Sequence, residues 1–143
     1  MIVLARYAGF GESTVTTATA CRVLGGTLVC LIGAALAFGG IQLWRRGPKA
    51  WPDVIASEMA VRRTSNGMLA MAVFLVIAGV AALANAPGGR HAAAIVTVAF
   101  VAAAFWANYA LFGDIRPLHV GTNIVVAALV LALLWFGSSG QTR

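Results

Sequence analysis

The side chains best suited to bind a ligand gather between residues 108 and 123, in otherwise apolar surroundings. They are two amides, a phenol, a guanidinium and an imidazole: Asn108, Tyr109, Arg116, His119 and Asn123. These groups donate or accept hydrogen bonds, so together they are candidates for holding a polar headgroup, such as a quinone ring or an anionic lipid. His119 and Asn123 are four residues apart, which places them on one face of a helix.

A structural role is the alternative for the same residues. An amide in hydrocarbon needs a hydrogen-bond partner, so Asn108 and Asn123 are expected to point into a helix bundle and to tie two helices together. In that interpretation Asp114 pairs with Arg116 or with the basic segment before residue 66, and His119 lies among the lipid headgroups.

Catalytic and metal chemistry is not indicated. The apolar segments contain no carboxylate, and no Ser or Cys lies beside a His at a useful spacing, so no catalytic residue is predicted. His91 and His119 begin successive apolar segments, which places them on opposite membrane surfaces about 30 Å apart, too far for one chain to ligate one haem with both. We predict no metal and no cofactor, with a bound quinone or lipid left open.

The elements that position these residues are membrane spans. Hydrophobic residues make up 61% of the 143-residue chain and charged residues only 10%, far from the roughly 25% charged residues of a soluble domain. Four segments of 17 to 22 residues carry no charge: 23–44, 67–85, 92–112 and 120–136. Since roughly 20 apolar residues cross a bilayer as a helix, we predict an all-α polytopic membrane protein, a single domain over 1–143 folded as an antiparallel four-helix bundle.

The first span carries a stripe of small residues. Glycines recur every seven residues, with two further small residues between them: Gly26, Cys30, Gly33, Ala37 and Gly40. Steps of seven drift by only about 20° around a helix, so these residues share one narrow face. Small side chains allow the close backbone approach that holds helices together in lipid. We therefore predict a helix-packing face; a groove for a lipid or quinone tail is the alternative.

The connection between the first two spans, residues 45–66, is long and basic. Its cations are candidates for binding anionic lipid or a partner protein: Arg45, Arg46, Lys49, Arg62 and Arg63. Trp51-Pro52-Asp53 is typical of a helix start, and Glu58 and Arg62 are spaced for an ion pair along a helix. The pattern predicts either a separate interfacial helix or an extension of the second span from about residue 53. The first twenty residues lack a helical period and predict an irregular or interfacial lead-in.

The orientation of the chain in the membrane is predicted by counting the basic residues on each side of the bilayer. The long connection and Arg116 together hold six, against four on the other side, at Arg6, Arg22, Arg90 and Arg143. Because Lys and Arg are retained on the cytoplasmic side, we expect both termini outside and the long loop in the cytoplasm, in a bacterial inner membrane. The net charge of +6 does not indicate nucleic-acid binding, because the basic residues flank apolar segments.

Three functions fit this pattern, the third being an anchor that presents the basic 45–66 connection to soluble partners or anionic lipid. The first is a non-catalytic membrane subunit that packs against other membrane protein subunits, or against copies of itself, and stabilises a larger complex. The second is an oligomeric binding protein or transporter for a small molecule, lipid or quinone, with its polar site at the cytoplasmic membrane end. The apolar surface and the small-residue stripe favour the first; the polar residues from 108 to 123 favour the second.

Overall fold

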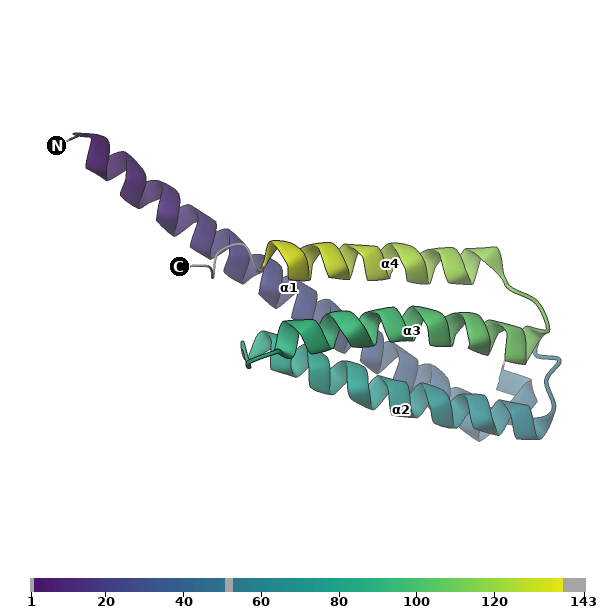
Figure 1. The fold of residues 1–143 in the computed structure, drawn as a ribbon. Helices are drawn as coiled ribbons and strands as arrows, with labels where there is room; N and C mark the ends of the chain where they lie inside the picture. Colours follow the sequence, from purple (N-terminus) through teal and green to yellow (C-terminus); the bar gives the residue numbers. More distant parts are fainter. Residues whose placement is uncertain (1, 51–52, 138–143) are drawn as a thin grey trace.

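Four long helices make up the chain in the computed structural model, which describes the backbone of residues 2–50 and 53–137 and the side chains of residues 17–50 and 53–137. They are α1 (Ile2–Arg46), α2 (Glu58–Leu83), α3 (Gly89–Phe112) and α4 (Pro117–Phe136), with a 3₁₀ turn, η1 (Gly47–Ala50), after α1. Consecutive helices run in opposite directions and pack as a bundle (Figure 1). All four are long and apolar enough to cross a membrane, so the predicted fold class is confirmed at this level.

Local sequence explains where the later helices begin and end. The side chain of Ser57 accepts a hydrogen bond from the backbone N–H of Ala60 at 3.3 Å and caps α2. Pro117 is at the first position of α4, where its missing N–H costs nothing. At the end of α3, Gly113 adopts φ 70° and its N–H bonds to the carbonyl of Tyr109. This left-handed closing residue is the usual place for glycine.

The irregular form of the predicted lead-in is wrong, because α1 is a single helix of 45 residues that begins at Ile2. At 1.5 Å per residue it is about 67 Å long, more than twice the roughly 30 Å hydrocarbon core. Its first part projects beyond the end of α4 (Figure 1). Extending an existing helix needs no new nucleus, so the threonine-rich stretch continues the helix although its intrinsic propensity is low.

The predicted interfacial helix is not seen in the described part of the connection between α1 and α2. After η1, residues 53–57 are non-helical, and α2 begins at Glu58. Trp51 and Pro52, which suggested a helix start, lie outside the described residues. The alternative of an extended second span is partly right: α2 starts nine residues before the apolar segment and passes through Ser65-Asn66-Gly67 without a break. Glu58 and Arg62 form the expected ion pair at 2.9 Å.

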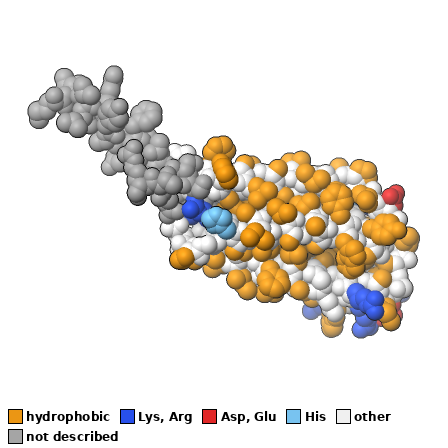
Figure 2. Space-filling view, viewed as in Figure 1, with side chains coloured by type: hydrophobic (Ala, Val, Ile, Leu, Met, Phe, Trp, Pro, Cys, Tyr) orange, Lys and Arg blue, Asp and Glu red, His pale blue; other side chains and the backbone are white. Residues whose placement is uncertain are grey.

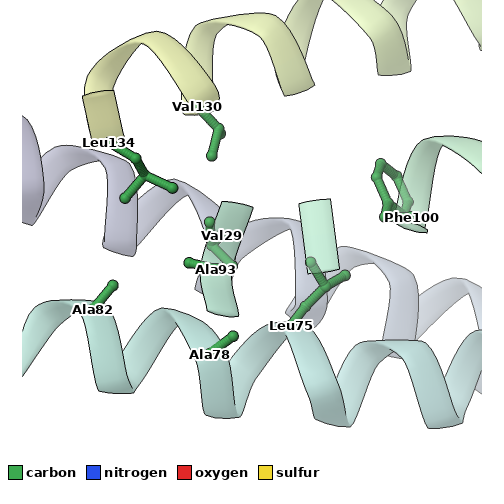
Figure 3. Close-up of a cluster of buried hydrophobic side chains, with 8 residues drawn as sticks. All are labelled: Val29, Leu75, Ala78, Ala82, Ala93, Phe100, Val130 and Leu134. Atoms are coloured by element: carbon green, nitrogen blue, oxygen red, sulfur yellow. The ribbon is translucent and has the colours of Figure 1, made fainter. Parts of the chain in front are cut away.

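The main hydrophobic core fills the half of the bundle nearest the chain termini. Figure 3 shows side chains from all four helices meeting there, at Val29, Leu75, Ala78, Ala82, Ala93, Phe100, Val130 and Leu134. A second cluster, around Leu43, Val61 and Leu111, lies at the opposite end. Between the charged ends, the flank of the bundle is covered with hydrophobic side chains (Figure 2), as expected of a surface that contacts lipid.

Candidate ligand-binding site

A cavity of about 930 Å³ lies between the four helices, in the half of the bundle that ends at the 45–66 connection. At the other end of the bundle α4 packs closely on α1, where a Cβ added to Gly25 would lie 3.1 Å from the side chain of Leu134. Toward the connection α1 and α4 diverge (Figure 1). Among the described helices α4 contacts α1 and α3 but not α2, so the space between α4 and α2 is left for the cavity.

The walls of this cavity are mostly apolar. They come from every helix and include Ile32, Leu36, Met68, Met71, Phe100 and Val126. Phe100 belongs also to the main core and Leu111 to the second cluster, so the cavity lies between the two cores. Its volume is in the range of pockets that enclose a small organic ligand, roughly 300–1,000 Å³.

Four polar side chains line the cavity at a similar depth, one of them Thr122, five residues after the start of α4. Thr64 lies six residues after the start of α2, Asn108 four residues before the end of α3, and Asn123 six residues after the start of α4. At 1.5 Å per residue each is therefore roughly 6–9 Å from the loop end of its helix. The polar side chains therefore lie near the loop end of the cavity, and its apolar walls lie further along the helices.

Two of these side chains are buried with unpartnered polar atoms. Thr64 is 1% exposed and Asn108 is 8% exposed. Among the described residues, neither the hydroxyl oxygen of Thr64 nor the amide oxygen Oδ1 of Asn108 has a hydrogen-bond partner. The amide nitrogen of Asn108 donates to the carbonyl of Ala104 at 3.0 Å, which fixes the orientation of the amide. Buried polar groups are normally paired, so these two atoms are exceptions, and each has less than 1 Å² of exposed surface.

A charged strap lies at the loop end of the cavity. We use "strap" for residues 53–57, between η1 and α2. The N–H of Ile55 bonds to the carbonyl of Leu111 at 3.1 Å, and the carboxylate of Asp53 accepts a hydrogen bond from Arg116 at 3.0 Å. The Arg116 guanidinium also lies 4.1 Å from the centre of the Phe112 ring, a cation–π contact. Asp53, Phe112 and Arg116 all line the cavity.

Gly113 leaves room for the strap to lie against the end of α3. Its positive φ of 70° disfavours other residues, and a Cβ there would lie 2.7 Å from Cδ1 of Ile55. A side chain at this position would therefore collide with the strap as well as strain the turn.

The structure brings four of the five headgroup candidates together: Asn108, Arg116, His119 and Asn123 line the cavity. Tyr109 does not; it is 64% exposed on the outside of α3. Adjacent helical residues point about 100° apart, so Asn108 and Tyr109 cannot both face the interior. His119 is exposed at the mouth, with its ring 6.4 Å from that of Phe112.

The expected partners of the charged groups differ from those observed. Arg116 pairs with Asp53 of the long connection, while the Asp114 carboxylate accepts from the N–H of the adjacent Ile115 at 2.6 Å. Asn108 bonds within its own helix instead of across to α4. Thr64 was missed by the sequence reasoning, because it follows Arg62-Arg63 and was assigned to the loop. The uninterrupted helical pattern that starts at Glu58 could have placed Thr64 inside a helix.

The small-residue stripe of α1 lies against α2. A Cβ on Gly26, Gly33 or Gly40 would come within 2.9–3.1 Å of α2 atoms, and the hydroxyl of Ser65 donates to the carbonyl of Gly40 at 2.8 Å. Cys30 and Ala37 are half-buried on the same helix. The five basic candidates, by contrast, are exposed at the end of the bundle: Arg45, Arg46, Lys49, Arg62 and Arg63.

Within the described residues, no three His, Cys, Asp or Glu side chains come together as a metal site. In comparisons with known proteins, no family model, no curated protein and no solved structure matches this chain.

Proposed function

We propose that this chain is a membrane protein that binds an amphipathic small molecule in the cavity between its helices. The apolar part of the molecule occupies the space lined by α1, α2, α3 and α4, and its polar end lies toward Arg116 and His119. The observation that carries the proposal is a cavity of about 930 Å³ whose mostly apolar lining also includes Asn108, His119 and Asn123. Apolar walls with a few placed polar groups are characteristic of ligand sites.

The alternative, a subunit that stabilises a larger complex, loses one of its supports in this geometry. The small-residue stripe was expected to offer more packing surface than the chain itself needs, yet α2 covers Gly26, Gly33 and Gly40. The remaining apolar flank is what any membrane protein presents to lipid. We therefore favour the binding protein and treat co-purifying subunits as the opposing outcome of the test.

We place the loop end of the bundle on the cytoplasmic side of a bacterial inner membrane, with both termini outside. The support is the surplus of Lys and Arg in the 45–66 connection and the exposure of its cations, which suits contact with anionic headgroups of the inner leaflet. In this orientation the site opens toward the cytoplasmic leaflet.

Blocking the cavity tests the proposal. Ala104 lines the cavity one turn before Asn108, whereas Ala102 is exposed and does not line it. Protein purified gently from native membranes is expected to carry one equivalent of an amphiphile, detected by mass spectrometry of the intact protein and of its organic extract. Ala104→Phe should lose the molecule and the matched control Ala102→Phe should keep it. Equal retention in both variants, or only protein subunits co-purifying, would refute the proposal.

A further inference from the structure

We propose that the ligand of this cavity carries an anionic headgroup on a single chain, and that the Arg116 guanidinium binds this headgroup in place of the Asp53 carboxylate. This inference rests on the proposed function and adds the chemical class of the ligand and the group that the ligand displaces. Arg116, Asp53 and Phe112 all line the cavity at its loop end. Fatty acids, which are carboxylates, and lysophospholipids, which are phosphates, share this chemistry.

The guanidinium of Arg116 already holds one carboxylate in the ligand-free structure. Its Nη1 atom donates to Oδ2 of Asp53 at 3.0 Å. Among the described residues this is the one hydrogen bond that the guanidinium makes. A guanidinium has five N–H donors in a fork that fits a carboxylate or a phosphate with two parallel bonds. The position therefore accepts an oxyanion and has donors left for one that is better placed.

Phe112 helps to hold Arg116 at the mouth of the cavity. The guanidinium carbon lies 4.1 Å from the centre of the Phe112 ring, an attraction that needs no counter-ion. The side chain of Asp53 is 59% exposed, so it can turn out into water, and exposed ion pairs are weak. A ligand whose chain is anchored in the cavity keeps its headgroup at a high local concentration beside Arg116, and it therefore competes well with Asp53.

The charges at this end of the bundle favour an anion. The 45–66 connection and the turn before α4 together hold six Lys and Arg side chains against three carboxylates. The first turn of α4 contains no acidic residue, so the positive end of its helix dipole adds to this potential. A positive surface attracts anionic amphiphiles and repels ammonium headgroups. An uncharged headgroup gains nothing from these charges and serves as the comparison in the experiment.

The apolar part of the cavity suits the chain of such a ligand. On α3 the lining runs from Phe100 to Phe112, which corresponds to about 18 Å along the helix axis. Met68 and Met71 line the cavity on α2, and methionine side chains adapt to flexible chains. A headgroup bound at Arg116 therefore leaves its chain inside the apolar walls.

The first experiment changes the headgroup and keeps the chain. Full-length protein in a nonionic detergent, at about pH 8 where a carboxylate is ionised, is titrated with hexadecanoate, hexadecyl phosphate and hexadecanol. The bound fraction is read by native mass spectrometry. At least one of the anions is expected to bind roughly tenfold more tightly than the alcohol, the effect of a charge-assisted hydrogen bond. The anion that binds more tightly identifies the source as a fatty acid or a lysophospholipid.

A matched pair of variants tests the role of Arg116. In Arg116→Gln the affinity for the anion should fall to that for hexadecanol, while the affinity for hexadecanol stays unchanged. Arg62→Gln is the control: Arg62 lies at the same end and is also ion-paired, to Glu58 at 2.9 Å, but it does not line the cavity. The preference for the anion should persist in this variant, although the net charge changes equally.

A second pair tests whether Asp53 is the group that the ligand displaces. Asp53→Asn removes the competing carboxylate and should raise the affinity for hexadecanoate roughly two- to fivefold. The affinity for hexadecanol should not change, because a looser mouth speeds its entry and its exit alike. Asp114→Asn is the control for net charge, since the Asp114 carboxylate accepts from the N–H of Ile115 at 2.6 Å and does not line the cavity.

The outcomes separate this inference from the proposed function. If hexadecanol binds the wild-type protein as tightly as both anions, the anionic headgroup is overturned and the binding function stands. The assignment to Arg116 is overturned if the preference survives Arg116→Gln or is lost equally in Arg62→Gln. Displacement of Asp53 is overturned if Asp53→Asn raises the affinity for hexadecanoate no more than Asp114→Asn does. If no amphiphile binds, or if binding is the same in Ala104→Phe, both proposals fail.

Discussion

The two unpartnered atoms are the most informative feature at the residue scale. A buried polar group without a hydrogen bond costs about 1–3 kcal/mol of stability. Thr64 and Asn108 each carry one such atom, with less than 1 Å² of exposed surface. Replacing either side chain by an apolar residue of similar shape removes that cost.

This account predicts the effect of removing one of them on the ligand-free protein. Thr64→Val deletes an unsatisfied hydroxyl and should raise the free energy of unfolding by about 1 kcal/mol, measured by denaturant titration in mixed micelles. Thr97 is the control: it is fully buried but its hydroxyl donates to the carbonyl of Ala93 at 2.7 Å. Thr97→Val should not stabilise the protein. A loss of stability in Thr64→Val would show that its hydroxyl has a partner.

Part of the site could be predicted from residue types alone. Amides, a guanidinium and an imidazole stand out in apolar segments, and four of the five headgroup candidates line the cavity. Thr64 could not be found in this way, because threonine is common in membrane helices and its neighbours are cations. Whether its hydroxyl is paired depends on which helix faces it, and that is a property of the packed bundle.

At the element scale, the strap lies at the mouth of the cavity. Asp53 and Arg116 join it to α4, and both partners are partly exposed. An exposed ion pair contributes roughly 0.2–1 kcal/mol, too little to affect folding but enough to alter how often the mouth opens.

Asp53→Asn should therefore accelerate release of a bound amphiphile by roughly two- to fivefold with little change in stability. The measurement is the dissociation rate of a fluorescent fatty alcohol by stopped flow. Glu58→Gln is the matched control, because it removes the other ion pair, to Arg62, which does not line the cavity. Equal release rates in the wild type and Asp53→Asn would show that the strap does not limit exit.

The close contact between α1 and α2 depends on glycines, which have no side chain. A Cβ on Gly33 would lie 2.9 Å from the side chain of Val76 and 3.0 Å from the backbone oxygen of Ala72, and the latter cannot rotate away. Gly33→Leu should lower the free energy of unfolding by at least about 1–3 kcal/mol. Gly121 has open space around its Cβ position, so Gly121→Ala should be neutral or stabilising. Similar stability of Gly33→Leu and the wild type would contradict the observed packing.

Hydrophobic segments predicted the four helices well, because length and lack of charge are what a bilayer requires. The starts of α3 and α4 lie within three residues of the expected positions, next to Pro and Gly signals. The lengths of hydrophobic segments could not predict where α1 and α2 begin, because both helices extend beyond their apolar segments at the N-terminal end. α1 extends to Ile2 and α2 to Glu58 because a helix held in a bundle propagates through residues of modest propensity.

At the scale of the whole molecule, orientation determines which leaflet supplies the ligand. In a background in which Cys21 and Cys30 are replaced by Ala, Lys49→Cys probes the basic end and Ala86→Cys the opposite end; both positions are exposed. In intact spheroplasts a membrane-impermeant maleimide should label Ala86→Cys and spare Lys49→Cys, because Lys and Arg favour the cytoplasmic side. The reverse pattern would place the site at the outer leaflet.

The most direct test of the central claim is an experimental density map of the protein in a lipid environment, such as cryo-electron microscopy in nanodiscs with a bound antibody fragment. We predict an elongated density in the cavity between α1, α2, α3 and α4, with its polar end toward Arg116 and His119. A cavity closed by side chains, or occupied by a helix of another subunit, would contradict the account.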